Sequence, residues 1–125
     1  MNRVSGFLLA LPLAACSSQG GGAAPTGEAV FRKCAICHRI GANEGNGIGP
    51  NLHGVVGRKA ASLPDFNYSP AMRGTGFTWD EKTLDHYLTA PQQVVPGTKM
   101  TFSGLPDSAS RKAVIGFLKR NSPRK

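Results

Sequence analysis

The sequence predicts an all-α domain in which three to four short helices are joined by long loops. The chain has 125 residues, which is enough for one hydrophobic core but not for two. Glycine and proline supply 16 and 9 of these residues, so loops should outweigh sheet and long helix. Apolar residues make up 40% of the chain, which excludes a fibrous or wholly disordered protein.

Three segments have the apolar spacing of amphipathic helices. The first covers residues 27–38. The second begins at a capping box over residues 78–81 and runs to about Ala90, and the third begins at residue 107 or 108. Their apolar faces carry Val30, Phe31, Cys34, Leu84, Tyr87, Leu88, Ala113, Val114, Phe117 and Leu118. Helices this short bury little apolar surface, so the core needs a further component.

The N-terminal residues have the features of an export signal. Arg3 provides a basic start, and the apolar run over residues 6–15 is shorter than the roughly 20 residues of a membrane-spanning helix. The run ends in Leu13-Ala14-Ala15-Cys16, which resembles the lipobox of bacterial lipoproteins. That resemblance implies lipidation of the cysteine, which becomes the mature N-terminus. The alternative is ordinary signal cleavage next to a chance cysteine.

The domain organisation follows from this signal. We expect a lipoprotein-type signal peptide at 1–15, and a lipidated Cys16 that begins a flexible Gly/Ala/Ser tether at 16–26. The remaining residues, 27–125, form the folded domain. The predicted location is therefore periplasmic or otherwise extracytoplasmic, with a lipid anchor in the membrane.

Cys34, Cys37 and His38 form the motif Cys-x-x-Cys-His, which is typical of c-type haem attachment. Thiols three positions apart lie on one helical face and can add to the two vinyl groups of one haem, while the adjacent imidazole reaches the iron. A thioredoxin-like redox pair would need a βαβ pattern. A zinc site would need four ligands, and His53 and His86 are isolated from each other and from any other cysteine. The motif therefore predicts one covalent haem c.

Further motifs follow in a fixed order: Gly49–Gly54, Gly57–Lys59, Trp79, Tyr87–Leu88, Pro96–Met100, Phe102 and Gly104. With the haem motif they make residues 27–121 resemble the class I cytochromes c, especially the mitochondrial and related bacterial forms. The resemblance implies an all-α fold around one haem. It also implies single-electron transfer between ferrous and ferric iron, without catalysis on a substrate.

The second iron ligand has five candidates in the sequence: Met72, Met100, His53, His86 and Lys99. Met100 lies in a loop punctuated by proline and glycine that can reach the other haem face, although a lone methionine is as often a core residue. A neutral thioether favours ferrous iron. The resemblance selects Met100, and leaves Met72 as a packing residue where mitochondrial forms have asparagine.

The resemblance assigns supporting roles around the iron. The Pro50 carbonyl would accept a hydrogen bond from the His38 ring, and the Tyr87 hydroxyl would contact the methionine sulfur. Three more residues, Arg58, Tyr68 and Trp79, match positions that hold a buried haem propionate. The alternative for Trp79 and Tyr87 is a structural role as core aromatics, and the two roles are compatible.

The formal net charge of +8 favours an anionic partner surface. We expect a monomer that binds no nucleic acid. The resemblance implies a cytochrome bc complex as electron donor and a terminal oxidase or photosynthetic reaction centre as acceptor. Gln92 and Gln93 stand where mitochondrial forms carry docking lysines, so the anchor at Cys16 would compensate by raising the local concentration at membrane partners. The alternative function is a small haem peroxidase or ligand sensor with an open sixth site.

Overall fold

The computed structural model describes residues 22–123. The predicted signal peptide at 1–15, Cys16 and most of the tether at 16–26 lie outside the described residues. Within residues 22–123 the protein has helices and one isolated β-bridge, between Lys59 and Thr78, but no strand. The all-α prediction is therefore confirmed.

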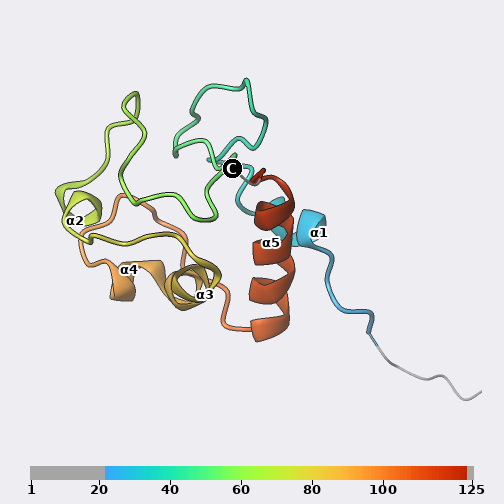
Figure 1. Ribbon diagram of the computed structural model, residues 1–125. Coiled ribbons are helices and arrows are strands. Elements are labelled where there is room, and N and C mark those ends of the chain that lie inside the picture. Colours follow the sequence, from blue (N-terminus) through green and yellow to red (C-terminus); the bar gives the residue numbers. More distant parts are fainter. Residues whose placement is uncertain (1–21, 124–125) are drawn as a thin grey trace, which may run out of the picture.

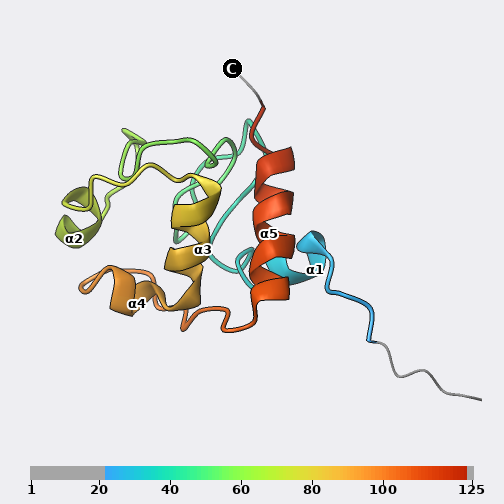
Figure 2. The ribbon, with the colours of Figure 1, turned by 60° about the horizontal axis from the view of Figure 1, so that its bottom comes forward.

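The helices follow one another as α1 (Gly27–Phe31), α2 (Pro70–Arg73), α3 (Glu81–Thr89), α4 (Pro91–Val94) and α5 (Ser108–Arg120). Figure 1 shows α1 against α5 on one side of the domain and α2, α3 and α4 on the other. In the turned view of Figure 2, α3 and α5 stand side by side, and they also make direct contact. The long segment between α1 and α2 contributes loops rather than helix, as the glycine and proline content predicts.

The first helix is shorter than the predicted span of 27–38. Thr26 caps α1, its hydroxyl oxygen accepting a hydrogen bond from the Ala29 N–H at 3.2 Å, and the regular helix ends at Phe31. The chain continues in turns: the N–H groups of Cys34 and Cys37 bond to carbonyls three residues earlier, and that of His38 to a carbonyl four residues earlier. These mixed turns, rather than a regular α-helix, carry the two cysteines.

Close packing of α1 on α5 depends on a glycine. A Cβ atom at Gly27 would lie 2.5 Å from the Ala113 carbonyl oxygen and 2.6 Å from Cβ of Phe117. Next to this contact the rings of Phe31 and Phe117 pack with their centroids 4.8 Å apart. The two helices therefore approach until backbone meets backbone, which brings the turns after α1 against the core.

The N-cap of α3 is Asp80 and not Thr78. The Asp80 carboxylate accepts a hydrogen bond from the Thr83 N–H at 2.7 Å, while Thr78 lies in the bridge with Lys59. Both residues are good N-caps, and the pairing of Thr78 across the chain leaves Asp80 to begin the helix. The predicted start of the last helix is confirmed, since Asp107 caps α5 through bonds from two backbone N–H groups.

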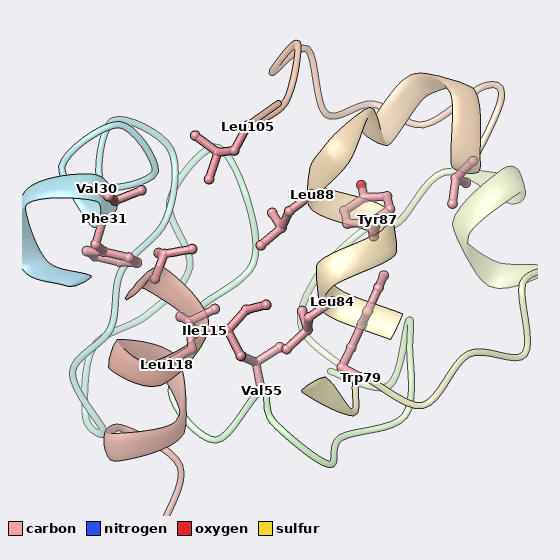
Figure 3. Close-up of a cluster of buried hydrophobic side chains, with 12 residues drawn as sticks. Val30, Phe31, Val55, Trp79, Leu84, Tyr87, Leu88, Leu105, Ile115 and Leu118 are labelled. Carbon is pink, nitrogen blue, oxygen red and sulfur yellow. The ribbon is translucent and has the colours of Figure 1, made fainter. Parts of the chain in front are cut away.

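The core lies between α1, α3 and α5 (Figure 3). Its buried hydrophobic residues are Val30, Phe31, Val55, Trp79, Leu84, Tyr87, Leu88, Val95, Leu105, Val114, Ile115 and Leu118. Three ion pairs border it: Arg111–Asp85 at 2.8 Å and Lys119–Glu81 at 3.2 Å join α5 to α3, and Arg120–Glu28 at 3.2 Å joins α5 to α1. The second and third pairs are more than half exposed and add little stability.

We expect Gly27→Ala to destabilise the protein by about 1–3 kcal/mol, because the new methyl group would clash with the α5 backbone. The measurement is the free energy of unfolding in urea or guanidinium chloride. Gly45→Ala is the matched control, since a Cβ atom there has no neighbour within 4 Å. Equal losses of stability in the two variants would contradict the role of Gly27.

Candidate functional site

A cavity of about 380 Å³ lies beside the core. Its walls come from the turns after α1, the loops around α2, one side of α3 and the segment 98–102. Every predicted site residue within residues 22–123 lines it: Cys34, Cys37, His38, Pro50, Arg58, Tyr68, Trp79, Tyr87 and Met100. The other predicted site residue, Cys16, lies outside the described residues. The structure therefore gathers residues spread over 67 positions, from 34 to 100, around one apolar space.

The cysteine segment is held against a glycine-rich loop. The Gly49 N–H donates to the Cys37 carbonyl at 2.8 Å, and a Cβ atom at Gly49 would lie 2.5 Å from Cε1 of His38. The loop backbone thus packs directly on the imidazole. Cys34 and Cys37 are not joined in a disulfide and both are partly buried, so each sulfur is available for a bond to a group in the cavity.

The His38 ring is held in one orientation and one tautomer. Its Nδ1 atom lies 2.7 Å from the Pro50 carbonyl oxygen, which can only accept a hydrogen bond, so Nδ1 carries the proton. Burial lowers the pKa of the imidazole, which favours the neutral ring. The lone pair of Nε2 is then available to a metal, in the arrangement that metal-binding histidines usually have.

Met100 presents its sulfur to the same cavity. The Tyr87 hydroxyl lies 3.3 Å from the Met100 sulfur and donates a hydrogen bond to it. Burial raises the pKa of Tyr87, so this hydroxyl keeps its proton at neutral pH. A thioether sulfur has two lone pairs, and the second one can bind a metal. Tyr87 also packs on Trp79, with ring centroids 5.0 Å apart.

Arg58 is a partly buried cation without a carboxylate partner among the described residues. Its guanidinium donates to the carbonyls of His53 at 3.1 Å and Asn51 at 2.9 Å. Burial lowers the pKa of this group, because the charged form loses hydration. Among residues 22–123 no Asp or Glu lines the cavity, so an anionic group bound there would supply the missing counter-charge.

These features fit haem c. Apolar walls match the porphyrin, two thiols match its vinyl groups, and imidazole and thioether are both iron ligands. The Arg58 guanidinium could form an ion pair with a haem propionate. Within residues 22–123 no group of three or more His, Cys, Asp or Glu side chains is placed to hold a metal ion by itself. The donor set therefore suits a metal already held in a macrocycle.

The remaining ligand candidates separate into two groups. Met72 and Lys99 line the cavity, and the Lys99 ammonium donates to the Asn67 carbonyl at 3.0 Å. His53 and His86 do not line it. His86 is exposed on α3, and Nδ1 of His53 lies 3.2 Å from the Ile40 carbonyl oxygen.

Asn51 is a functional residue that the sequence reasoning missed. Its buried side chain donates to the carbonyls of Gly41 and Glu44, at 3.0 and 2.8 Å, and accepts a bond from the His53 N–H at 2.7 Å. It thereby closes the loop that carries Pro50. Its place directly after Pro50 was the available signal, but its partners lie up to ten positions away and cannot be identified from spacing.

No protein-family model matches the chain, but comparison with individual proteins finds similar sequences and structures. The chain is 53% identical over 92 residues to cytochrome c2 of Rhodoblastus acidophilus, covering 74% of this chain and 86% of that relative. It is 55% identical over 92 residues to cytochrome c2 of Rhodomicrobium vannielii, covering 74% of each. The solved structure of cytochrome cH from Methylobacterium extorquens matches with a TM-score of 0.72 and 41% identity, covering 79% of this chain and 99% of that one.

Sequence identity at this level, the common fold and the Cys-x-x-Cys-His segment at the wall of an apolar cavity all agree. The chain therefore belongs to the class I c-type cytochromes: it is an electron carrier, not an enzyme, and carries one haem c attached through Cys34 and Cys37.

Proposed function

We propose that His38 and Met100 are the two axial ligands of the haem iron. When bound, haem c supplies the ferrous/ferric couple that accepts and releases one electron. The hydrogen bond between the Tyr87 hydroxyl and the Met100 sulfur is the observation that carries the assignment. It orients one lone pair of the sulfur toward the hydroxyl and leaves the other for iron, while Pro50 orients the imidazole.

The surroundings suit a carrier better than a peroxidase. With two protein ligands, the iron would have no open position for peroxide or oxygen, which a peroxidase or ligand sensor requires. Buried apolar side chains exclude water and lower the local dielectric, which disfavours the additional charge of ferric iron. A neutral thioether ligand also favours ferrous over ferric iron. The chain's own residues therefore favour a positive reduction potential.

The partners we propose are membrane electron-transfer complexes: a cytochrome bc complex as donor, and a terminal oxidase or reaction centre as acceptor. The exposed side chains of Lys33 and Lys99 line the cavity, and none of its lining residues is acidic. Ile36 and Ile48, which also line it, are 78% and 80% exposed. An apolar centre with cations around it suits a partner surface that carries carboxylates.

We further propose that the protein works outside the cytoplasm, where haem is attached, and is anchored by lipid at Cys16. A flexible segment of ten residues has a root-mean-square reach of about 17 Å, so the domain would stay near the membrane and turn freely. No helix within residues 22–123 is long and apolar enough to cross a membrane. The anchor would raise the effective concentration at membrane partners and offset the loss of docking lysines at positions 92 and 93.

We expect Met100→Ala to abolish the sulfur–iron charge-transfer band of the ferric protein and to lower its reduction potential, because the thioether ligand is lost. Absorption spectroscopy and potentiometric titration measure both effects. Met72→Ala is the matched control, since Met72 lines the same cavity and should leave the band in place. A high-spin ferric spectrum and peroxide turnover in the unmodified protein would instead support the peroxidase.

We expect Cys16→Ala to slow oxidation of the cytochrome by a membrane-bound oxidase at low cytochrome concentration, because the domain is no longer held near its partner. Oxygen consumption by oxidase-containing vesicles measures the rate. A second form that lacks residues 16–25 tests the tether as well as the lipid and keeps Thr26, the N-cap of α1. Equal rates for the anchored and anchor-free forms would contradict the proposed compensation.

A further inference from the structure

We propose that Gln92 is a positioning residue for Met100: its side-chain amide holds the methionine loop in the conformation that presents sulfur to the haem. The amide nitrogen Nε2 of Gln92 donates to the Met100 carbonyl oxygen at 3.1 Å. The inference rests on the proposed ligation of iron by Met100. It adds a residue that lies outside the cavity and touches neither the sulfur nor the haem attachment site.

The backbone that carries Gln92 is fixed by its neighbours. Pro91, which begins α4, is less than 2% exposed, and Val95, directly after this helix, is 3% exposed. The Val95 N–H bonds back to the Pro91 carbonyl at 2.9 Å. Although the Gln92 side chain is exposed, it projects from a short helix that is anchored in the core at both ends.

A turn brings Met100 back to this helix. The Thr98 N–H donates to the Val95 carbonyl at 3.0 Å, and Gly97 has φ of 87° after Pro96, which are the features of a type II turn. The turn reverses the chain direction directly after α4. The backbone of Met100 is thereby brought within reach of the side chain of Gln92.

Met100 is held by side chains and not by secondary structure. Its N–H donates to the Thr98 hydroxyl at 3.2 Å, its carbonyl accepts from Gln92, and its sulfur accepts from Tyr87. Within the described part of the chain its backbone forms no hydrogen bond to another backbone group. The Thr98 contact is local to the loop, so Gln92 is the attachment that joins the Met100 backbone to a helix.

Loss of this attachment should favour release of the sulfur from iron. A competing ligand then binds the ferric iron more tightly, because less free energy is needed to displace Met100. One hydrogen bond to a neutral side chain corresponds to a change of between about twofold and tenfold in such an equilibrium. The hydrogen bond from Lys99 to the Asn67 carbonyl does not involve Gln92 and is left in place by the substitution.

The test is titration of the ferric holoprotein with imidazole, followed through the loss of the sulfur–iron charge-transfer band. We expect Gln92→Ala to bind imidazole about two- to tenfold more tightly than the unmodified protein, and its band to disappear at a lower temperature. Gln93→Ala is the matched control: Gln93 lies in the same helix, is also exposed, and forms no side-chain hydrogen bond within residues 22–123. Gln92→Glu retains the size of the side chain but removes the donor, and should behave like Gln92→Ala.

The outcomes distinguish the positioning role of Gln92 from the ligation of iron by Met100. If the unmodified protein lacks the sulfur–iron band, ligation by Met100 is wrong and the role of Gln92 falls with it. If the band is present but the position 92 and position 93 variants bind imidazole equally, only the role of Gln92 is overturned. Unfolding followed by far-ultraviolet circular dichroism serves as a second measurement, and we expect it to change less than the band in Gln92→Ala.

Discussion

The helices of this protein are too short to form a complete hydrophobic core by themselves. In the described part of the chain the helices span 5, 4, 9, 4 and 13 residues, and of these only α3 and α5 exceed two turns. Elements of this length bury enough apolar surface only if they share a large apolar partner. In a c-type cytochrome that partner is the haem, which would cover the apolar walls of the cavity. The prosthetic group is therefore part of the hydrophobic core as well as the redox centre.

Burial controls the chemistry of the groups around this cavity. The same loss of hydration keeps the His38 imidazole neutral, keeps the Tyr87 hydroxyl protonated, and leaves the Arg58 cation in need of a counter-charge. Each of these states is the one that the proposed role requires. A neutral ring can bind iron, a protonated hydroxyl can donate to sulfur, and a cation can pair with a propionate. Loss of hydration thus sets the protonation states of His38 and Tyr87 and the need of Arg58 for an anionic partner.

The long helix α5 places both sides of the site. It packs backbone to backbone on α1 through Gly27, and so positions the turns that carry the cysteines. On its other side it contacts α3, which carries Tyr87. The chain runs from α3 into α4, and the turn at Gly97 then reverses its direction and leads to Met100. Residues that are distant in sequence meet because the two longest helices provide a common frame.

Features that depend on local spacing could be predicted from the amino-acid sequence. The Cys-x-x-Cys-His motif indicated haem c, the apolar periodicity indicated three helices but not the end of the first, and the last helix was expected to begin at residue 107 or 108, as it does. Each of these signals lies within a few residues. From the residues alone, however, Met100 was only one of several ligand candidates. Its selection came from the resemblance, and it stays a prediction.

Features that depend on contacts between distant segments became visible in the folded protein. Thr78 and Asp80 are both acceptable caps, and pairing of Thr78 with Lys59 decides between them. The first helix ends at Phe31, and the turns that follow it bond to the distant loop at Gly49. Asn51 and Gln92 are polar residues of ordinary appearance, whose partners are known only once the loops are closed. Residue spacing gives information about neighbours within about one helical turn. The cap of α3 and the partners of Asn51 and Gln92 depend instead on contacts between segments that meet only in the folded protein.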